Sequence, residues 1–106
     1  MIISGSENIY PKEVEEVLYR HPAVQDAAVF GIPDEKWGES VCAAIVLKPG
    51  ASASETDIVE FCRANLAGYK KPRMVKFMDA MPRTSIGKIA KAELREPYWR
   101  GSGRKI

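Results

Sequence analysis

The stretch Asp26-Ala-Ala-Val-Phe-Gly-Ile32, followed after a polar loop by Val41-Cys-Ala-Ala-Ile-Val-Leu47, decides the fold of this chain. Both runs are short and apolar, and turn-forming dipeptides, Pro33-Asp34 and Pro49-Gly50, close them. A short apolar run between turn signals is typical of a buried strand. We therefore predict two adjacent strands, paired antiparallel.

A helix is predicted before the first strand, from Tyr10 to Arg20. Pro11 suits its first turn, and His21-Pro22 ends it. The apolar residues Val14, Val17 and Leu18 share one face. Glu13, Glu15 and Glu16 favour the N-terminal end, and we interpret them as a solvated helix face rather than as paired catalytic carboxylates.

A second helix is predicted after the second strand. Ser54 and Asp57 have the spacing of a capping box, and Gly68 can end the helix. Its apolar face would hold Ile58, Phe61, Cys62 and Leu66.

A third strand, Met74 to Met78, and a short helix, Lys88 to about Arg95, complete the pattern. The tail from Glu96 onward is rich in Gly, Ser and charge, which suggests poor order. The order of elements predicts an α+β domain, with a small, mostly antiparallel three-stranded sheet packed by helices. With 106 residues we expect one domain, residues 1–98, and a flexible tail, residues 99–106.

Charge is divided unevenly along the chain. Residues 1–67 hold five Lys and Arg against eleven Asp and Glu, whereas residues 68–106 hold eleven against three. A basic half attracts phosphate-bearing ligands or nucleic acid, and it can also be a solvated face.

No signal peptide or membrane span is evident in the sequence. Cys42 and Cys62 are typical of buried thiols in a reducing compartment, so we expect a cytoplasmic location.

The basic half contains the motif Pro82-Arg-Thr-Ser-Ile-Gly-Lys88-Ile-Ala-Lys-Ala. A glycine before a lysine lets the backbone approach a ligand closely while the ammonium reaches an anion. The motif is not a nucleotide-hydrolase phosphate loop, because Pro82 replaces the first glycine and Ile89 replaces the hydroxyl residue. A Gly-Lys pair by itself is equally compatible with an ordinary exposed loop lysine.

The whole motif resembles the C-terminal signature of the adenylate-forming enzymes, which include acyl-CoA synthetases, luciferases and peptide-synthetase adenylation domains. Every element of that signature, Pro-(Arg/Lys)-Thr-x-x-Gly-Lys-(Ile/Val)-x-(Lys/Arg), is present. The resemblance implies that this chain is the mobile C-terminal lid domain of such an enzyme. It makes Lys88 the adenylation lysine, supported by Thr84, Ser85 and Gly87.

Three further segments resemble the acyl-CoA synthetase branch, and the resemblance implies that they bind coenzyme A. The N-terminal turn, Gly5-Ser6-Glu7, would edge the tunnel for the pantetheine thiol, although the family commonly has two glycines where Gly5-Ser6 stands. Trp37 would lie against coenzyme A. In Tyr69-Lys70-Lys71-Pro72-Arg73, the resemblance places the aromatic Tyr69 near adenine and assigns phosphate neutralisation to the basic residues, which include Lys71 and Arg73.

Each of these segments also has a plainer interpretation. Ser6 or Asn8 could cap the following helix. Trp37 could fold its loop back onto the core or form an exposed aromatic platform. A cluster such as residues 69–73 is often only a solvated turn. His21 reads as a helix-end residue, and because it is the only histidine, neither a Ser-His-Asp triad nor a His-rich metal site can be assembled; we predict no metal site.

The implied reaction joins ATP and a carboxylic acid as an acyl-adenylate, and coenzyme A then displaces AMP. The phosphate loop, adenine pocket and acid pocket of the family belong to a larger N-terminal domain. We therefore expect the 106-residue chain alone to be inactive. We also expect Mg²⁺ to bind mainly through ATP and that N-terminal domain. Pro82 with Gly87-Lys88 also resembles the context in which lysine acetyltransferases silence acyl-CoA synthetases, which implies such a partner for Lys88. The alternative is a stand-alone basic module that binds nucleic acid or protein. The acid substrate cannot be read from this chain.

Overall fold

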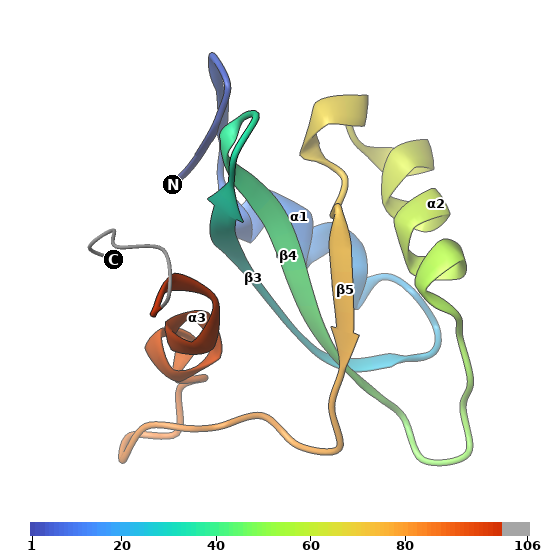
Figure 1. The fold of residues 1–106 in the computed structure, drawn as a ribbon. Helices are drawn as coiled ribbons and strands as arrows, with labels where there is room; N and C mark the ends of the chain where they lie inside the picture. The colour runs from blue at the N-terminus through green and yellow to red at the C-terminus, as the bar shows by residue number, and fades with distance from the viewer. Residues whose placement is uncertain (101–106) are drawn as a thin grey trace.

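The computed structural model describes residues 1–100, apart from the side chain of Tyr69, and has two helical layers around one sheet (Figure 1). Its elements, in chain order, are β1 (Ile2–Ser4), β2 (Glu7–Ile9), α1 (Pro11–Tyr19), β3 (Val24–Asp34), β4 (Gly38–Leu47), α2 (Glu55–Asn65), the 3-10 helix η1 (Gly68–Lys70), β5 (Met74–Phe77) and α3 (Lys91–Trp99).

The β3–β4 hairpin forms the centre of the sheet and confirms the predicted antiparallel pair. Its register runs from Val24 opposite Leu47 to Asp34 opposite Gly38. The strands are longer than predicted, so the expected loop from Pro33 to Ser40 is reduced to a tip at residues 35–37. The polar residues between the two apolar runs mostly extend the strands.

The α+β class and the mostly antiparallel sheet are confirmed, but the strand count of three was wrong. The sheet has five strands among the described residues: β1 and β2 form an additional hairpin, β1 meets β4 at Ser4 and Gly38, and β5 pairs with β4 in parallel. Strands of three residues are too short to show an apolar period. The capping interpretation of the N-terminal turn was wrong for the same reason, because Ser6 lies in the hairpin turn and Asn8 in β2, while α1 has Tyr10 at its N-cap and no side-chain cap.

Both faces of the central hairpin are buried, which explains why its strands are apolar throughout. One face packs on α1 and α2 in a core that includes Val29, Ile45, Leu18 and Ile58. Alternate residues face α3 in a second core that includes Phe30 and Leu94. Cys42 and Cys62 are free and buried as predicted, and burial raises the pKa of each thiol to about 11.

The helices on the first face follow their sequence signals closely. The predicted apolar residues of α1 are buried, and Ser54 and Asp57 form the predicted reciprocal capping box at the start of α2. Helix α2 ends at Asn65, before Gly68, which instead begins η1. Among the α1 acids, Glu16 is exposed as predicted, and Glu13 pairs with Lys70 while its side chain stays 43% exposed. The solvated interpretation was wrong for Glu15, which is 18% exposed and pairs with Lys91.

Helix α3 differs most from its prediction. It begins at Lys91 rather than Lys88 and continues to Trp99 with Pro97 inside it, so the tail predicted from Glu96 is helical as far as Trp99. Trp99 is buried, and its indole Nε1 donates a hydrogen bond of 2.9 Å to the carbonyl oxygen of Gly31. Residues 101–106 of the predicted tail lie outside the described residues. In residues 1–100, no helix has the length and apolar character to cross a bilayer.

Candidate functional site

The lysine loop, residues 82–90, is a small hairpin of its own. Arg83 and Ile89 form an antiparallel bridge, and the Thr84 N–H donates to the Lys88 carbonyl oxygen at 2.7 Å. The Gly87 N–H donates to the Thr84 carbonyl oxygen at 2.9 Å, which closes the turn. Gly87 has a φ of 86°, in the left-handed region that glycine adopts without steric strain. The glycine before the lysine therefore sets the turn that presents Lys88.

Lys88 is exposed at the end of this turn. Its ammonium makes no hydrogen bond or ion pair with any other described residue. Thr84 and Ser85 are also exposed, and Ile86 between them and Gly87 is 77% exposed. The loop thus offers an ammonium and two hydroxyl groups to a ligand that approaches from solvent.

A second candidate site is a groove of about 240 Å³ formed by three separate segments, and its lining residues are Ser4, Ser6, Glu7, Trp37 and Arg73. Gly5 lies beside it, and its N–H donates to the Trp37 carbonyl oxygen at 2.7 Å. Gly5 has a φ of 62°, and a Cβ at that position would lie 3.0 Å from Cε3 of the Trp37 ring. Both the conformation and the close contact with the Trp37 ring therefore favour glycine there.

Trp37 is held by its own turn and carries two cations on its ring. The Asp34 carboxylate accepts hydrogen bonds from the N–H groups of Lys36, at 2.8 Å, and Trp37, at 2.9 Å. The bond from the Trp37 N–H is the largest cause that lowers the pKa of Asp34 below its usual 3.8. The Lys36 ammonium lies 4.8 Å and the Arg73 guanidinium 5.5 Å from the ring centroid. Trp37 is partly buried, so it is both an anchor of its turn and a wall of the groove.

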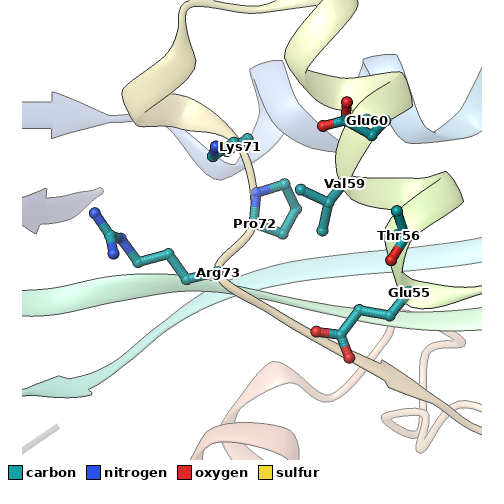
Figure 2. Close-up of a pocket in the computed structure, with 7 residues that line it drawn as sticks. All are labelled: Glu55, Thr56, Val59, Glu60, Lys71, Pro72 and Arg73. Atoms are coloured by element: carbon teal, nitrogen blue, oxygen red, sulfur yellow. The ribbon is translucent and has the colours of Figure 1, made fainter.

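Lys71 does not line this groove but a neighbouring cavity of about 420 Å³ between α2 and the start of β5. Figure 2 shows Val59 and Pro72 at its centre and the acids Glu55 and Glu60 on the α2 side. Arg73 borders both cavities and extends away from α2 in this view. The backbone of Tyr69 lies in η1, and its side chain is outside the described part of the structure.

The two candidate sites lie at opposite ends of the molecule. Figure 1 shows the β1–β2 hairpin and the β3–β4 tip at the top, and the orange segment that contains the lysine loop at the bottom. The structure thus brings Ser6, Glu7, Trp37 and Arg73 together, with Gly5 against Trp37, and keeps Lys88 apart from them.

Three acidic residues that sequence reasoning did not select support these sites. Asp26 binds Arg83 of the lysine loop, 57 residues away, and Glu15 binds Lys91 just after the loop. Glu39 accepts a hydrogen bond of 3.0 Å from the Ile3 N–H, which joins β1 to β4. Their partners are distant in the sequence, so no local pattern signals them.

Comparison with known proteins identifies the family of this chain. The family model of the AMP-binding enzyme C-terminal domain matches residues 13–88, which include Trp37, Arg73 and Lys88. The chain belongs to this family.

Members of the AMP-binding family resemble the chain over nearly its whole length. It is 53% identical over 98 residues to the long-chain-fatty-acid–CoA ligase FadD13 of Mycobacterium tuberculosis, covering 92% of this chain and 19% of that protein. It is 45% identical over 105 residues to the fatty acid–[acyl-carrier-protein] ligase ScoC of Streptomyces coeruleorubidus, covering 99% of this chain and 20% of that protein.

A solved fatty acyl-CoA synthetase of Mycobacterium tuberculosis matches the fold with a TM-score of 0.86 at 51% identity, covering 92% of this chain and 19% of that one. The chain thus spans about a fifth of the length of these relatives. The alternative of a stand-alone module for nucleic acid or protein gains no support from these comparisons.

Proposed function

We propose that this chain acts as the mobile C-terminal domain of an acyl-CoA synthetase, using its two ends in two successive half-reactions. The observation that carries the proposal is the state of Lys88, an exposed ammonium without a partner among the described residues, presented by a hydrogen-bonded turn. A cation in that state suits a site that another domain completes. A ligand there would be anionic.

In the first half-reaction, a carboxylate oxygen attacks the α-phosphorus of ATP, and the bond to pyrophosphate breaks to leave an acyl-adenylate. Lys88 would lie between the carboxylate and the phosphate, where it stabilises the negative charge that develops as the bond forms. The Thr84 and Ser85 hydroxyls would donate further hydrogen bonds to phosphate oxygens. Gly87, which has no side chain, would let the backbone of the loop approach the phosphate closely.

In the second half-reaction, the thiol of coenzyme A loses its proton and attacks the acyl carbon, and AMP leaves. The groove formed by Ser6, Glu7, Trp37 and Arg73 would guide the pantetheine arm of coenzyme A. The Arg73 guanidinium would lie near the phosphates of coenzyme A. Lys71 in the neighbouring cavity and Tyr69 would contribute to the nucleotide end. Because the groove and Lys88 lie at opposite ends, the domain would have to reorient between the two steps.

The remaining components would come from the N-terminal domain of the same enzyme. Among residues 1–100, no group of three or more His, Cys, Asp or Glu side chains is placed to hold a metal ion, so we expect Mg²⁺ to arrive with ATP. The chain alone should form no thioester. We place the enzyme in the cytoplasm and propose that acetylation of Lys88 by a lysine acetyltransferase would inactivate adenylation, because it removes the ammonium charge.

The thiol acceptor has a second candidate, because one relative is named as a ligase of acyl carrier protein. A carrier protein presents the same phosphopantetheine arm without the nucleotide. The two acceptors would depend differently on Lys71 and Arg73. These residues would be needed to bind the nucleotide of coenzyme A, which a carrier protein lacks. Assays with coenzyme A and with holo acyl carrier protein would separate them.

The decisive experiment is Lys88→Ala in the ligase that contains this domain, assayed in both half-reactions. The acid would be whichever of benzoate, octanoate and palmitate the ligase activates. We expect pyrophosphate release to fall by about 100-fold to 1000-fold, in line with the loss of one preorganised charge donor. Thioester formation from supplied acyl-adenylate should stay within about twofold of the parent. An equal loss in both half-reactions would show that Lys88 maintains the fold rather than the chemistry.

A further inference from the structure

We propose that Arg83 and Lys91 are positioning residues for Lys88, and that with Asp26 and Glu15 they form an ion-pair clamp on both sides of the lysine loop. The inference rests on the proposed adenylation role of Lys88. It adds to that role a reason why the loop holds one conformation although most of it is exposed.

The first end of the clamp precedes the turn. Arg83 donates from Nη1 to the carbonyl oxygen of Gly87 at 3.0 Å and from Nη2 to Oδ2 of Asp26 at 3.0 Å. Asp26 belongs to β3, at the centre of the fold. One guanidinium thus joins the residue just before Lys88 to the sheet, which a lysine with a single ammonium could not do in the same geometry.

The second end follows the turn at the start of α3. The Lys91 ammonium lies 2.7 Å from Oε2 of Glu15, and the same oxygen accepts a hydrogen bond of 2.9 Å from the Val29 N–H. Glu15 therefore joins α3, through Lys91, to both α1 and β3. The Glu15 side chain is only 18% exposed, so this end is anchored in a partly buried place.

The clamp also sorts the charges around the loop. Residues 83–91 contain three cations, Arg83, Lys88 and Lys91. Two of them are paired with carboxylates, and the Lys88 ammonium is the one without a described partner. Pairing removes competition for an incoming anion, because neutralised neighbours attract it less than Lys88 does.

The expected effect is on geometry rather than on stability. The Arg83 side chain is 45% exposed, and partly exposed ion pairs contribute little to the free energy of unfolding. Catalysis is far more sensitive, since misplacing a reacting group by about 1 Å can cost roughly 100-fold in rate. A clamp that stabilises little can therefore still control adenylation.

The test compares Arg83→Ala, Asp26→Ala and their double variant in the ligase, with benzoate, octanoate or palmitate as the acid. We expect each single variant to lower kcat for pyrophosphate release by about tenfold. The double variant should lose little more than Arg83→Ala alone, because both substitutions break the same Arg83–Asp26 ion pair. Thioester formation from supplied acyl-adenylate should not change. Lys91→Ala should act in the same direction, and Arg63→Ala, which breaks an ion pair on α2, is the matched control and should change neither half-reaction.

Hydrogen exchange in the 106-residue chain supplies a readout independent of activity. Asp26→Ala should speed exchange of the Thr84 and Gly87 amides, which the turn protects, whereas Lys88→Ala should leave them unchanged. Additive losses in the double variant, equal losses in both half-reactions, or unchanged pyrophosphate release would each overturn the clamp. If instead Lys88→Ala itself spares adenylation, the proposed function fails, whatever the clamp variants do.

Discussion

The lysine loop and the Trp37 groove are held in place by different means. The loop comes from one stretch of chain, residues 82–90, and presents a solvent-exposed ammonium with no described partner. The groove comes from three segments whose backbones touch, with Gly5 packed against the Trp37 ring and two cations over that ring. In the proposed function a partner surface would complete the loop, whereas the groove is shaped within this domain.

This difference predicts how substitutions behave. Changes in the loop should affect adenylation through the charge and the position of the Lys88 ammonium. Changes in the groove should affect the thiol step through packing, and their size should depend on how many contacts each residue makes.

Trp37→Ala should have the largest effect on the groove. The variant removes one wall of the groove and the ring on which Lys36 and Arg73 lie. We expect thioester formation from supplied acyl-adenylate to fall by about tenfold to 100-fold, in line with roughly 1.5–3 kcal/mol for the loss of one large apolar contact. Pyrophosphate release should stay within about twofold.

The matched control is Phe77→Ala, which removes a 40% exposed ring at the far end of β5. It should change neither half-reaction by more than about twofold. A loss of adenylation equal to the loss of thioester formation in Trp37→Ala would mean that the two regions are not functionally separate.

The same contrast explains how far the sequence predicts this molecule. Lys88 and its turn could be found because Pro82, Gly87 and Lys88 lie within one motif, and the central hairpin because each strand is a continuous apolar run. The anchors could not be found, because Asp26 and Arg83 are 57 residues apart and Trp99 bonds to a backbone carbonyl 68 residues away. Composition also gave a wrong prediction for the segment up to Trp99, which was expected to be a poorly ordered tail. The segment is helical because the burial of Leu94 and Trp99 stabilises α3 by more than Pro97 destabilises it.

Glu39→Ala should have a smaller effect on the groove than Trp37→Ala, because Glu39 does not line the groove and acts only through β1. The Glu39 carboxylate accepts a hydrogen bond from the Ile3 N–H. It also lies close to Gly31, where an added Cβ would come within 2.2 Å of the Glu39 Oε2 atom. Gly31→Ala should therefore displace the same carboxylate and reproduce the effect. Loss of one hydrogen bond to a charged acceptor should loosen β1, and we expect thioester formation to fall about threefold to tenfold.

Two comparisons test this explanation. Glu39→Gln keeps an acceptor oxygen and should lose less activity than Glu39→Ala. Exchange of the Ile3 amide should be faster in both Glu39→Ala and Gly31→Ala than in the parent chain. Unchanged exchange in Gly31→Ala would show that the carboxylate keeps its bond to β1 by another path.

Asp34 should have the smallest effect, because it orders the turn without lining the groove. Asp34→Ala should slow thioester formation by about twofold to threefold, whereas Asp34→Asn keeps an acceptor and should stay near the parent rate.

The hydrogen bond from the Trp37 N–H lowers the pKa of Asp34 below 3.8, so the folded turn favours the ionised carboxylate. This stabilisation is present above about pH 4 and is lost as the pH falls through the lowered pKa. The Trp37 amide proton, followed by NMR, should therefore titrate with a midpoint below 3.8 in the parent chain and show no such step in Asp34→Asn. A midpoint at or above 3.8 would mean that Asp34 does not hold Trp37 in solution, and that Trp37 is held by Gly5 and by the two cations over its ring.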